Sequence, residues 1–212
     1  MVKNKLLPYI QGTLVKTRDG KLQMLKITTA ETTPGKQLPT GKAYSEVFQK
    51  KLEQFGRIDC LNMIIDSRGG SFYSAAGCQD AIRKLQKAGK IGKIRILIDG
   101  RCSSAATLVA FSNYENCEVN ITPSSGIYIH MPKVYQYTKT GGIWSVIQKM
   151  GTKTVIKTLV EMYRNKTHVP KRVIREWMEK GKFFNAGEAV NIGFCDCILT
   201  RTEFEKGGVW NC

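Results

Sequence analysis

Small residues stand between two apolar stretches at Cys102 to Ala106, and they include two adjacent serines. The run follows the apolar residues 94–99 and leads into a helical pattern over residues 105–113, so Ser104 is expected at a helix start directly after a strand. The first N–H groups of a helix have no intrahelical partner, and the N–H of Ala105 can stabilise negative charge that develops beside Ser104. Small neighbours let a substrate backbone come close.

Two adjacent glycines, Gly69 and Gly70, follow another apolar run, residues 58–66. Glycine adopts backbone conformations that turn N–H groups toward a shared anion position, which a side chain would crowd. Taken separately, this pair also fits a tight turn, and the Ser104 segment also fits an ordinary helix cap. Taken together, the two segments fit the two halves of an oxyanion hole.

A histidine lies near the end of a third apolar segment, residues 127–132. Strand alternation puts Tyr128 and His130 on one face, and Pro132 ends the strand. A single strand histidine is often only structural. A serine, a glycine pair and a histidine at the ends of successive elements are nevertheless the components of an acyl-transfer site.

The elements that must position these residues alternate between strand and helix. This order predicts right-handed βαβ units and a largely parallel sheet, in which active residues collect at the carboxyl ends of the strands. The expected strands are 22–27, 58–66, 94–99, 117–123 and 126–132, and the expected helices are 43–55, 72–89 and 105–113.

The chain divides by composition into four parts. Residues 1–42 are predicted to form an N-terminal arm, residues 43–133 plus 182–200 the main α/β domain, residues 134–181 a basic helical segment, and residues 201–212 a C-terminal tail. Within the helical segment we expect a long helix over 143–163 and a second over 171–181. The apolar residues of this segment must pack on its own domain or against a copy of the chain.

Charge and cysteine content restrict the function further. The chain has 33 basic and 17 acidic residues, but the basic residues are dispersed, so a solvated surface is expected rather than a nucleic-acid site. Seven cysteines without CxxC spacing predict reduced thiols, and Cys195, Cys197 and two histidines are too few for a zinc site. No membrane-length apolar run or secretory signal occurs, which predicts a cytoplasmic protein. No metal or other cofactor is expected.

Four segments in order resemble the signatures of ClpP-type serine peptidases. They are 66-DSRGGSFYSAAGCQDAIRKL-85, 98-IDGRCSSAATLVAFS-112, 127-IYIHMP-132 and 184-FNAGEAVNIGFCDCIL-199. The resemblance covers roughly residues 43–200, and its variation is most similar to phage and prophage members. It implies an α/β fold of the ClpP/crotonase type, with repeated ββα and βαβ units and a protruding handle that contains a long helix.

The resemblance also implies residue roles. Ser104 corresponds to the nucleophile and His130 to the general base. The N–H groups of Gly70 and Ala105 correspond to the oxyanion hole, and Gly69 shapes its turn. An extended substrate would pair as an added strand beside the chain after Gly70 and the chain after Pro132, so the expected substrate-binding residues are Ser71, Phe72 and Pro132.

This sequence departs from the family pattern at two positions. Gly181 stands where the family has its third catalytic acid, so we expect Glu179 to supply the carboxylate, with Asp196 as the weaker candidate. Arg68 replaces the proline before the two glycines.

The implied function is a serine endopeptidase that cleaves extended or unfolded protein chains. Two alternatives stay open: a catalytically impaired relative with a structural or regulatory role, and a crotonase-type protein that binds an acyl thioester. The resemblance further implies a homo-oligomeric ring, heptameric or stacked as a tetradecamer, and possible work with a separate AAA+ unfoldase, since the chain has no phosphate-binding loop. No membrane partner is expected.

Overall fold

The computed structural model describes residues 15–16, 22–28, 50, 52–53, 56–70, 72–140, 143–150 and 153–206. Of the predicted helix over 43–55, only residues 50, 52 and 53 are described, and they are helical. Ser71 and most of the predicted N-terminal arm lie outside the described residues. The strands are β1 (Val15–Lys16), β2 (Leu22–Thr28), β3 (Ile58–Ser67), β4 (Ile91–Ser103), β5 (Cys117–Ile121), β6 (Gly126–Ile129), β7 (Lys133–Thr140), β8 (Ile143–Met150), β9 (Lys182–Asn185) and β10 (Cys197–Ile198). The helices are α2 (Phe72–Lys87), α3 (Ala106–Ala110), α4 (Lys153–Thr167), α5 (Lys171–Lys180), α6 (Ala186–Asn191) and α7 (Arg201–Lys206).

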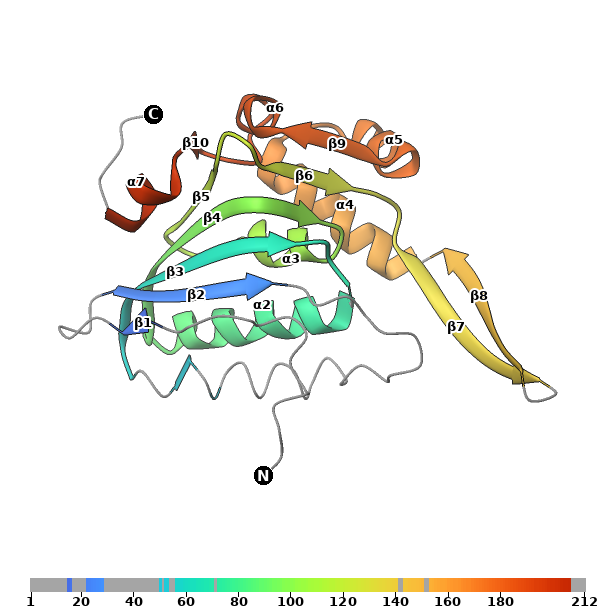
Figure 1. The fold of residues 1–212 in the computed structure, drawn as a ribbon, viewed down its shortest axis with the longest axis horizontal. Coiled ribbons are helices and arrows are strands. Elements are labelled where there is room, and N and C mark those ends of the chain that lie inside the picture. Colours follow the sequence, from blue (N-terminus) through green and yellow to red (C-terminus); the bar gives the residue numbers. More distant parts are fainter. Residues whose placement is uncertain are drawn as a thin grey trace.

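An eight-stranded sheet forms the centre of the molecule (Figure 1). Its main path runs β1-β2-β3-β4-β5-β10, while β6 pairs with β4 and β9 pairs with β6. The pairs from β2 to β5 are parallel, as is β4 with β6, whereas β9 runs antiparallel to β6. The predicted parallel α/β arrangement is therefore confirmed.

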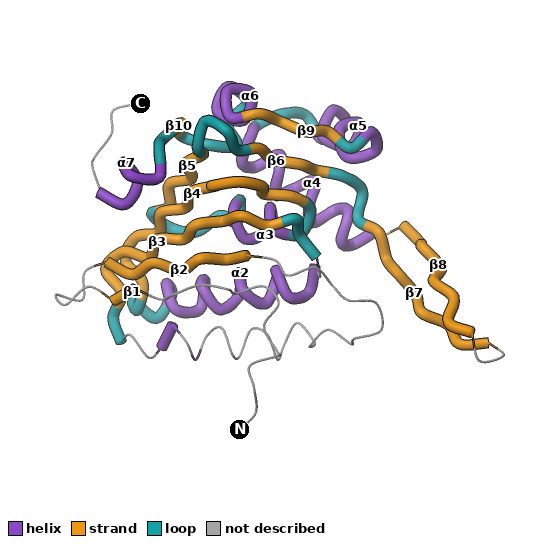
Figure 2. Tube along the Cα trace, viewed as in Figure 1, coloured by secondary structure: helices purple, strands orange, loops and turns teal. Residues whose placement is uncertain are grey.

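One face of this sheet forms the main hydrophobic core. Alternate residues of β3 (Leu61, Met63 and Ile65) are buried there in one cluster with apolar residues of α2, α3 and α4. Successive strand side chains point to opposite faces, so a run of branched apolar residues can serve both faces of a covered sheet. Helix α2 is seen along the sheet in Figure 2, and it accounts for the strongly helical period of residues 72–87.

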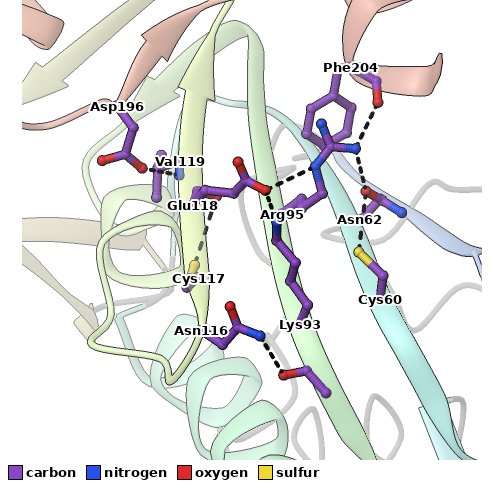
Figure 3. Close-up of polar contacts among 11 residues, drawn as sticks. Cys60, Asn62, Lys93, Arg95, Asn116, Cys117, Glu118, Val119, Asp196 and Phe204 are labelled. Carbon is purple, nitrogen blue, oxygen red and sulfur yellow. Dashed lines mark hydrogen bonds and ion pairs between the residues drawn. The ribbon is translucent and has the colours of Figure 1, made fainter. Parts of the chain in front are cut away.

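The opposite face is more polar and is covered by α7, within the predicted C-terminal tail. Arg95 is only 5% exposed, and its Nε lies 3.3 Å from the Glu118 carboxylate. Its Nη1 donates to the backbone carbonyl of Phe204 at 3.0 Å and to Asn62 at 3.5 Å, and its guanidinium carbon lies 4.5 Å from the centre of the Phe204 ring (Figure 3). The buried charge is thus paired and hydrogen-bonded while it holds α7 in place.

Strand β4 changes its neighbour at Gly100, and this change creates the site. Up to Ile98 it pairs with β5, and from Arg101 it pairs with β6. Gly100 has φ 124°, and its N–H donates to the Ser125 hydroxyl at 2.6 Å. The next N–H, of Arg101, donates to the Asp66 carboxylate at 3.0 Å, and that carboxylate lies in the space a Cβ on Gly100 would need. Glycine is therefore required where the strand bends.

The segment after Pro132 differs from the prediction. Residues 133–140 (β7) and 143–150 (β8) pair as an antiparallel hairpin that projects from the main domain (Figure 1). The long helix begins at Lys153 rather than at residue 143. The sequence contains a signal for this hairpin, because Gly141 and Gly142 separate two stretches rich in aromatic and β-branched residues. The helix predicted from the spacing of the apolar residues between 143 and 150 was therefore wrong.

The last part of the main domain is a short strand followed by a short helix. Residues 182–185 form strand β9, and α6 begins at Ala186 with a capping box between Asn185 and Glu188. Cys197 forms a disulfide bond, so the prediction of reduced thiols is wrong for this residue, whereas the other described cysteines are not disulfide-bonded. None of the helices in the described part of the chain is long and apolar enough to span a membrane.

We predict that Phe204→Ala destabilises the protein by about 3 kcal/mol, because it uncovers Ile64 and Leu97 and removes the ring beneath Arg95. Urea unfolding followed by circular dichroism measures the change. Glu205→Ala in the same helix is the matched control. It removes only an exposed ion pair with Arg201 and should change the free energy of unfolding by less than about 0.5 kcal/mol. Equal effects of the two substitutions would contradict this account of α7.

Candidate active site

Ser104 lies in the turn between β4 and α3. Its φ is 55°, a left-handed conformation that is uncommon for residues other than glycine. The helix itself begins at Ala106, with Ala105 as its N-cap, so Ser104 precedes the helix start that was predicted for it. Strain of this kind persists only where surrounding contacts hold it, and it is concentrated at functional sites.

Three contacts hold the Ser104 turn. The N–H of Ser104 donates to the Tyr128 carbonyl at 2.9 Å, which ties the turn to β6. The Thr107 hydroxyl donates to the Ser104 carbonyl at 2.5 Å and also shares a 2.6 Å hydrogen bond with the Tyr163 hydroxyl. Thr107 and Tyr163 are buried, so helix α4 supports the turn from beneath.

Gly69 brings the two predicted halves of the oxyanion hole together. Its φ is 93°, and a Cβ placed on it would lie 2.6 Å from the Cβ of Ser104 and 3.0 Å from the backbone nitrogen of Ala105. Real Cβ atoms do not approach other atoms so closely, so only glycine permits this contact. The N–H of Gly69 is itself bound to the Ser67 hydroxyl at 3.1 Å.

The neighbouring N–H groups are available. Within the described part of the chain, the N–H groups of Gly70 and Ala105 donate no hydrogen bond, although Ala105 is buried. A buried donor such as the Ala105 N–H is nearly always paired, so its lack of a partner needs an explanation, whereas Gly70 is exposed. Two available N–H groups on either side of a serine turn are what an oxyanion hole requires.

His130 directly follows β6, and the β4–β6 pairing places this strand end beside the Ser104 turn. Ser103 pairs with Tyr128, two residues before His130. Among the described residues, no hydrogen bond joins the Ser104 hydroxyl to the imidazole. The sheet thus brings together the two backbones that sequence reasoning paired, at the carboxyl ends of adjacent parallel strands.

The imidazole of His130 is bound through Nδ1, which lies 2.6 Å from the backbone carbonyl of Met131. A carbonyl only accepts, so we assign the proton to Nδ1 and leave Nε2 as the basic nitrogen. Burial lowers the pKa of His130, the Met131 carbonyl opposes that shift, and the positive charge of Lys133 lowers the pKa further. The neutral imidazole, which is the form a general base needs, is thereby favoured.

No carboxylate contacts His130 within the described part of the chain. Glu179 is exposed in the last turn of α5. A backbone hydrogen bond joins this turn to the residue after His130, because the Met131 N–H donates to the Met178 carbonyl at 2.8 Å. Gly181 ends α5 with φ 70°, and extending the β6–β9 register by one residue past Ile129–Lys182 sets it opposite His130. The role expected of Glu179 stays a prediction.

Asp196, the weaker candidate for the acid, lies beside other strands. Its carboxylate accepts from the N–H of Val119 on β5 at 2.6 Å (Figure 3), and it pairs with Lys166 at 3.4 Å. These contacts give it a structural role between β5 and β10.

The expected substrate-binding residues flank the site. Phe72 is half-buried at the first position of α2, so from this residue onward the chain is helical and cannot pair as a strand with substrate. Pro132 is half-buried between β6 and β7, and within the described residues β7 pairs only with β8, which leaves its other edge open for strand addition.

Sequence reasoning missed two groups at His130. The Met131 carbonyl is a main-chain atom, so residue type gives no signal for it. Tyr128 did have a signal, because it shares the strand face of His130. Its ring stacks on the imidazole, with centroids 5.5 Å apart and planes inclined by 30°.

The parallel sheet, its helices and the turn at the end of β4 define a ClpP-like α/β fold. Residues 43–202 match the family model described as Clp protease, and the chain belongs to this family. It is 22% identical over 151 residues to an ATP-dependent Clp protease proteolytic subunit of Deinococcus radiodurans, which covers 70% of this chain and 69% of that protein. A solved mutant of ClpP1 from Listeria monocytogenes superposes with a TM-score of 0.54 at 17% identity, over 76% of this chain and 88% of that one.

We predict that Gly69→Ala lowers the rate of ester hydrolysis, because the new methyl group pushes the Ser104 turn away. The expected loss is about 100- to 1000-fold, as for the removal of one oxyanion donor. Steady-state kinetics with a small peptide ester measures it. Gly89→Ala is the matched control, since Gly89 has φ 67° with no atom within 4 Å of its Cβ position. It also places a side chain at a positive φ, without the clash, and should keep full activity. Wild-type rates for Gly69→Ala would overturn this reading of the turn.

The pH profile should reflect the lowered pKa of His130. A general base acts when neutral, so kcat/KM should rise with pH through a midpoint below 6.5 and then level off. The measurement is ester hydrolysis from about pH 5 to pH 8. Lys133→Gln removes a charge that lowers the pKa of His130, so its midpoint should move upward. A midpoint above 6.5 in the unsubstituted protein would contradict the prediction.

Proposed function

We propose that this protein is a serine endopeptidase that cleaves extended or unfolded chains through an acyl-enzyme on Ser104. The observation that carries the proposal is the contact of Gly69 with Ser104 and Ala105, which sets unpaired N–H groups beside a strained serine turn at the end of β4. Family membership supports the peptidase class.

The proposed reaction begins when Nε2 of His130 takes the proton of the Ser104 hydroxyl, and Oγ attacks the peptide carbonyl. The N–H groups of Gly70 and Ala105 bind the resulting oxyanion. The imidazolium then gives its proton to the leaving amine, which departs as the C–N bond breaks. Water hydrolyses the acyl-enzyme by the same proton route, which restores Ser104.

The third catalytic group is proposed from position rather than from contact. Glu179, at the end of α5, would need to turn toward His130 to act as the orienting carboxylate, while the Met131 carbonyl already binds Nδ1. Loss of a triad acid costs about 10⁴-fold when the histidine adopts the wrong tautomer. A carbonyl acceptor at Nδ1 supports the required tautomer without supplying negative charge.

Gly181 favours a second candidate function, a catalytically impaired family member with a structural or regulatory role. With glycine opposite His130, the usual position of the acid has no carboxylate. Such a protein would keep the fold and the Ser104 turn but turn over slowly or not at all.

Substrate and assembly are proposed on the family resemblance. An extended chain would add to the open edge of β7, beside Pro132, and would be read mainly through its backbone. The D. radiodurans relative is named as the proteolytic subunit of an ATP-dependent protease. By analogy we propose a cytoplasmic homo-oligomeric ring, a phage-type origin and a separate AAA+ unfoldase as an optional partner.

The test is labelling with a fluorophosphonate, which reacts covalently with activated serines. Unsubstituted protein should label and Ser104→Ala should not, whereas Ser103→Ala, which removes the adjacent hydroxyl, should still label. Equal labelling of Ser104→Ala would remove Ser104 from the role. Labelling without cleavage of casein or peptide esters would support the impaired alternative.

A further inference from the structure

We propose that Tyr128 is a positioning residue for His130, and that its ring occupies the volume that a side chain at position 181 would otherwise fill. The inference rests on the proposed role of His130 as general base. Three observations support it: a ring contact between Tyr128 of β6 and His130 just after that strand, a close approach of Tyr128 to Gly181 at the end of α5, and the backbone hydrogen bond of Met131 to α5.

The ring contact restricts the imidazole. Tyr128 and His130 are two residues apart on one strand face, and their rings are stacked at 5.5 Å. The Tyr128 side chain thus covers one face of the imidazole and shields it from water, although the residue is 37% exposed.

The approach to Gly181 shows why glycine stands there. A Cβ placed on Gly181 would lie 3.3 Å from the Cζ atom of Tyr128 and nearer still to its hydroxyl oxygen. The φ of 70° would also be open to Asn or Asp, so backbone conformation alone does not require glycine. A side chain at position 181 would have to displace the phenol of Tyr128, which lies across the position opposite His130.

The remaining constraint on the imidazole comes from the main chain. The Met131 N–H is held by the Met178 carbonyl of α5, so the carbonyl that binds Nδ1 belongs to an anchored peptide. With one edge of His130 hydrogen-bonded and one face stacked, rotation about both side-chain bonds is restricted. Tyr128 and the Met131 carbonyl together orient the His130 imidazole, the role that a third catalytic acid has in the family pattern.

The first test separates the effect of the Tyr128 ring from that of its hydroxyl and from that of a neighbouring aromatic ring. Tyr128→Leu should lower kcat for a small peptide ester by about 10- to 100-fold with KM unchanged, the usual cost of a misplaced catalytic group. Tyr128→Phe keeps the ring and should retain most of the activity. The matched control is Phe183→Leu, because Phe183 pairs with Tyr128 across β6–β9 and is 56% exposed, yet no ring contact joins it to His130. Full activity of Tyr128→Leu would overturn the proposal.

A second readout does not depend on turnover. The chain has only two histidines, so NMR titration can follow His130, with the exposed His168 as internal reference. In Tyr128→Leu the pKa of His130 should rise toward its ordinary value, because water reaches the ring, whereas Tyr128→Phe should titrate like the unsubstituted protein. An unchanged His130 titration in Tyr128→Leu would refute the contact, even if Ser104 proves unreactive and the proposed function fails.

A double-substitution cycle tests the shared volume. Gly181→Ala should displace the Tyr128 ring and shift the His130 titration in the same direction as Tyr128→Leu. The double variant Tyr128→Leu/Gly181→Ala should shift the His130 titration no further than Tyr128→Leu alone, because the clash has been removed. Additive effects of the two substitutions would show that residues 128 and 181 act independently, contrary to the proposal.

Discussion

The close approach of Gly69 to the Ser104 turn is the constraint on which the rest of the site depends. A single methyl group at position 69 would collide with the Cβ of Ser104 and reach the nitrogen of Ala105. The chemistry needs two loops from different βα units within van der Waals contact, and this contact requires a position without a side chain. A hydrogen bond from Ser104 to the Tyr128 carbonyl and one from the Thr107 hydroxyl to Ser104 then hold the turn in a conformation that a serine alone would rarely adopt.

The sheet topology makes that approach possible. Strand β4 leaves β5 and joins β6 at Gly100, where the Asp66 carboxylate and the Ser125 hydroxyl bind the bent backbone. The end of β4 therefore lies beside both the glycine turn after β3 and the histidine after β6. Without the bend, Ser104 would continue along β5, away from His130.

The surroundings of His130 contain no carboxylate partner within the described part of the chain. Its contacts there are a backbone carbonyl at Nδ1 and an aromatic ring over one face of the imidazole. Both restrain orientation, and burial lowers the pKa of His130, which favours the neutral imidazole. Neither supplies a full negative charge, so an imidazolium is stabilised less than in a triad, which is consistent with either a slower peptidase or an impaired one.

The sequence alone determined the parallel α/β fold and the positions of Gly69, Ser104 and His130, because turn glycines, strand alternation and helical period are properties of residues close together in the chain. It did not determine the 133–150 hairpin, whose apolar spacing also fits a helix, or the docking of α7 on Arg95. Only the tertiary structure decided that the phenol of Tyr128 lies over Gly181 and that the Met131 carbonyl binds His130. Those contacts depend on strand register and on main-chain atoms, which residue types do not specify.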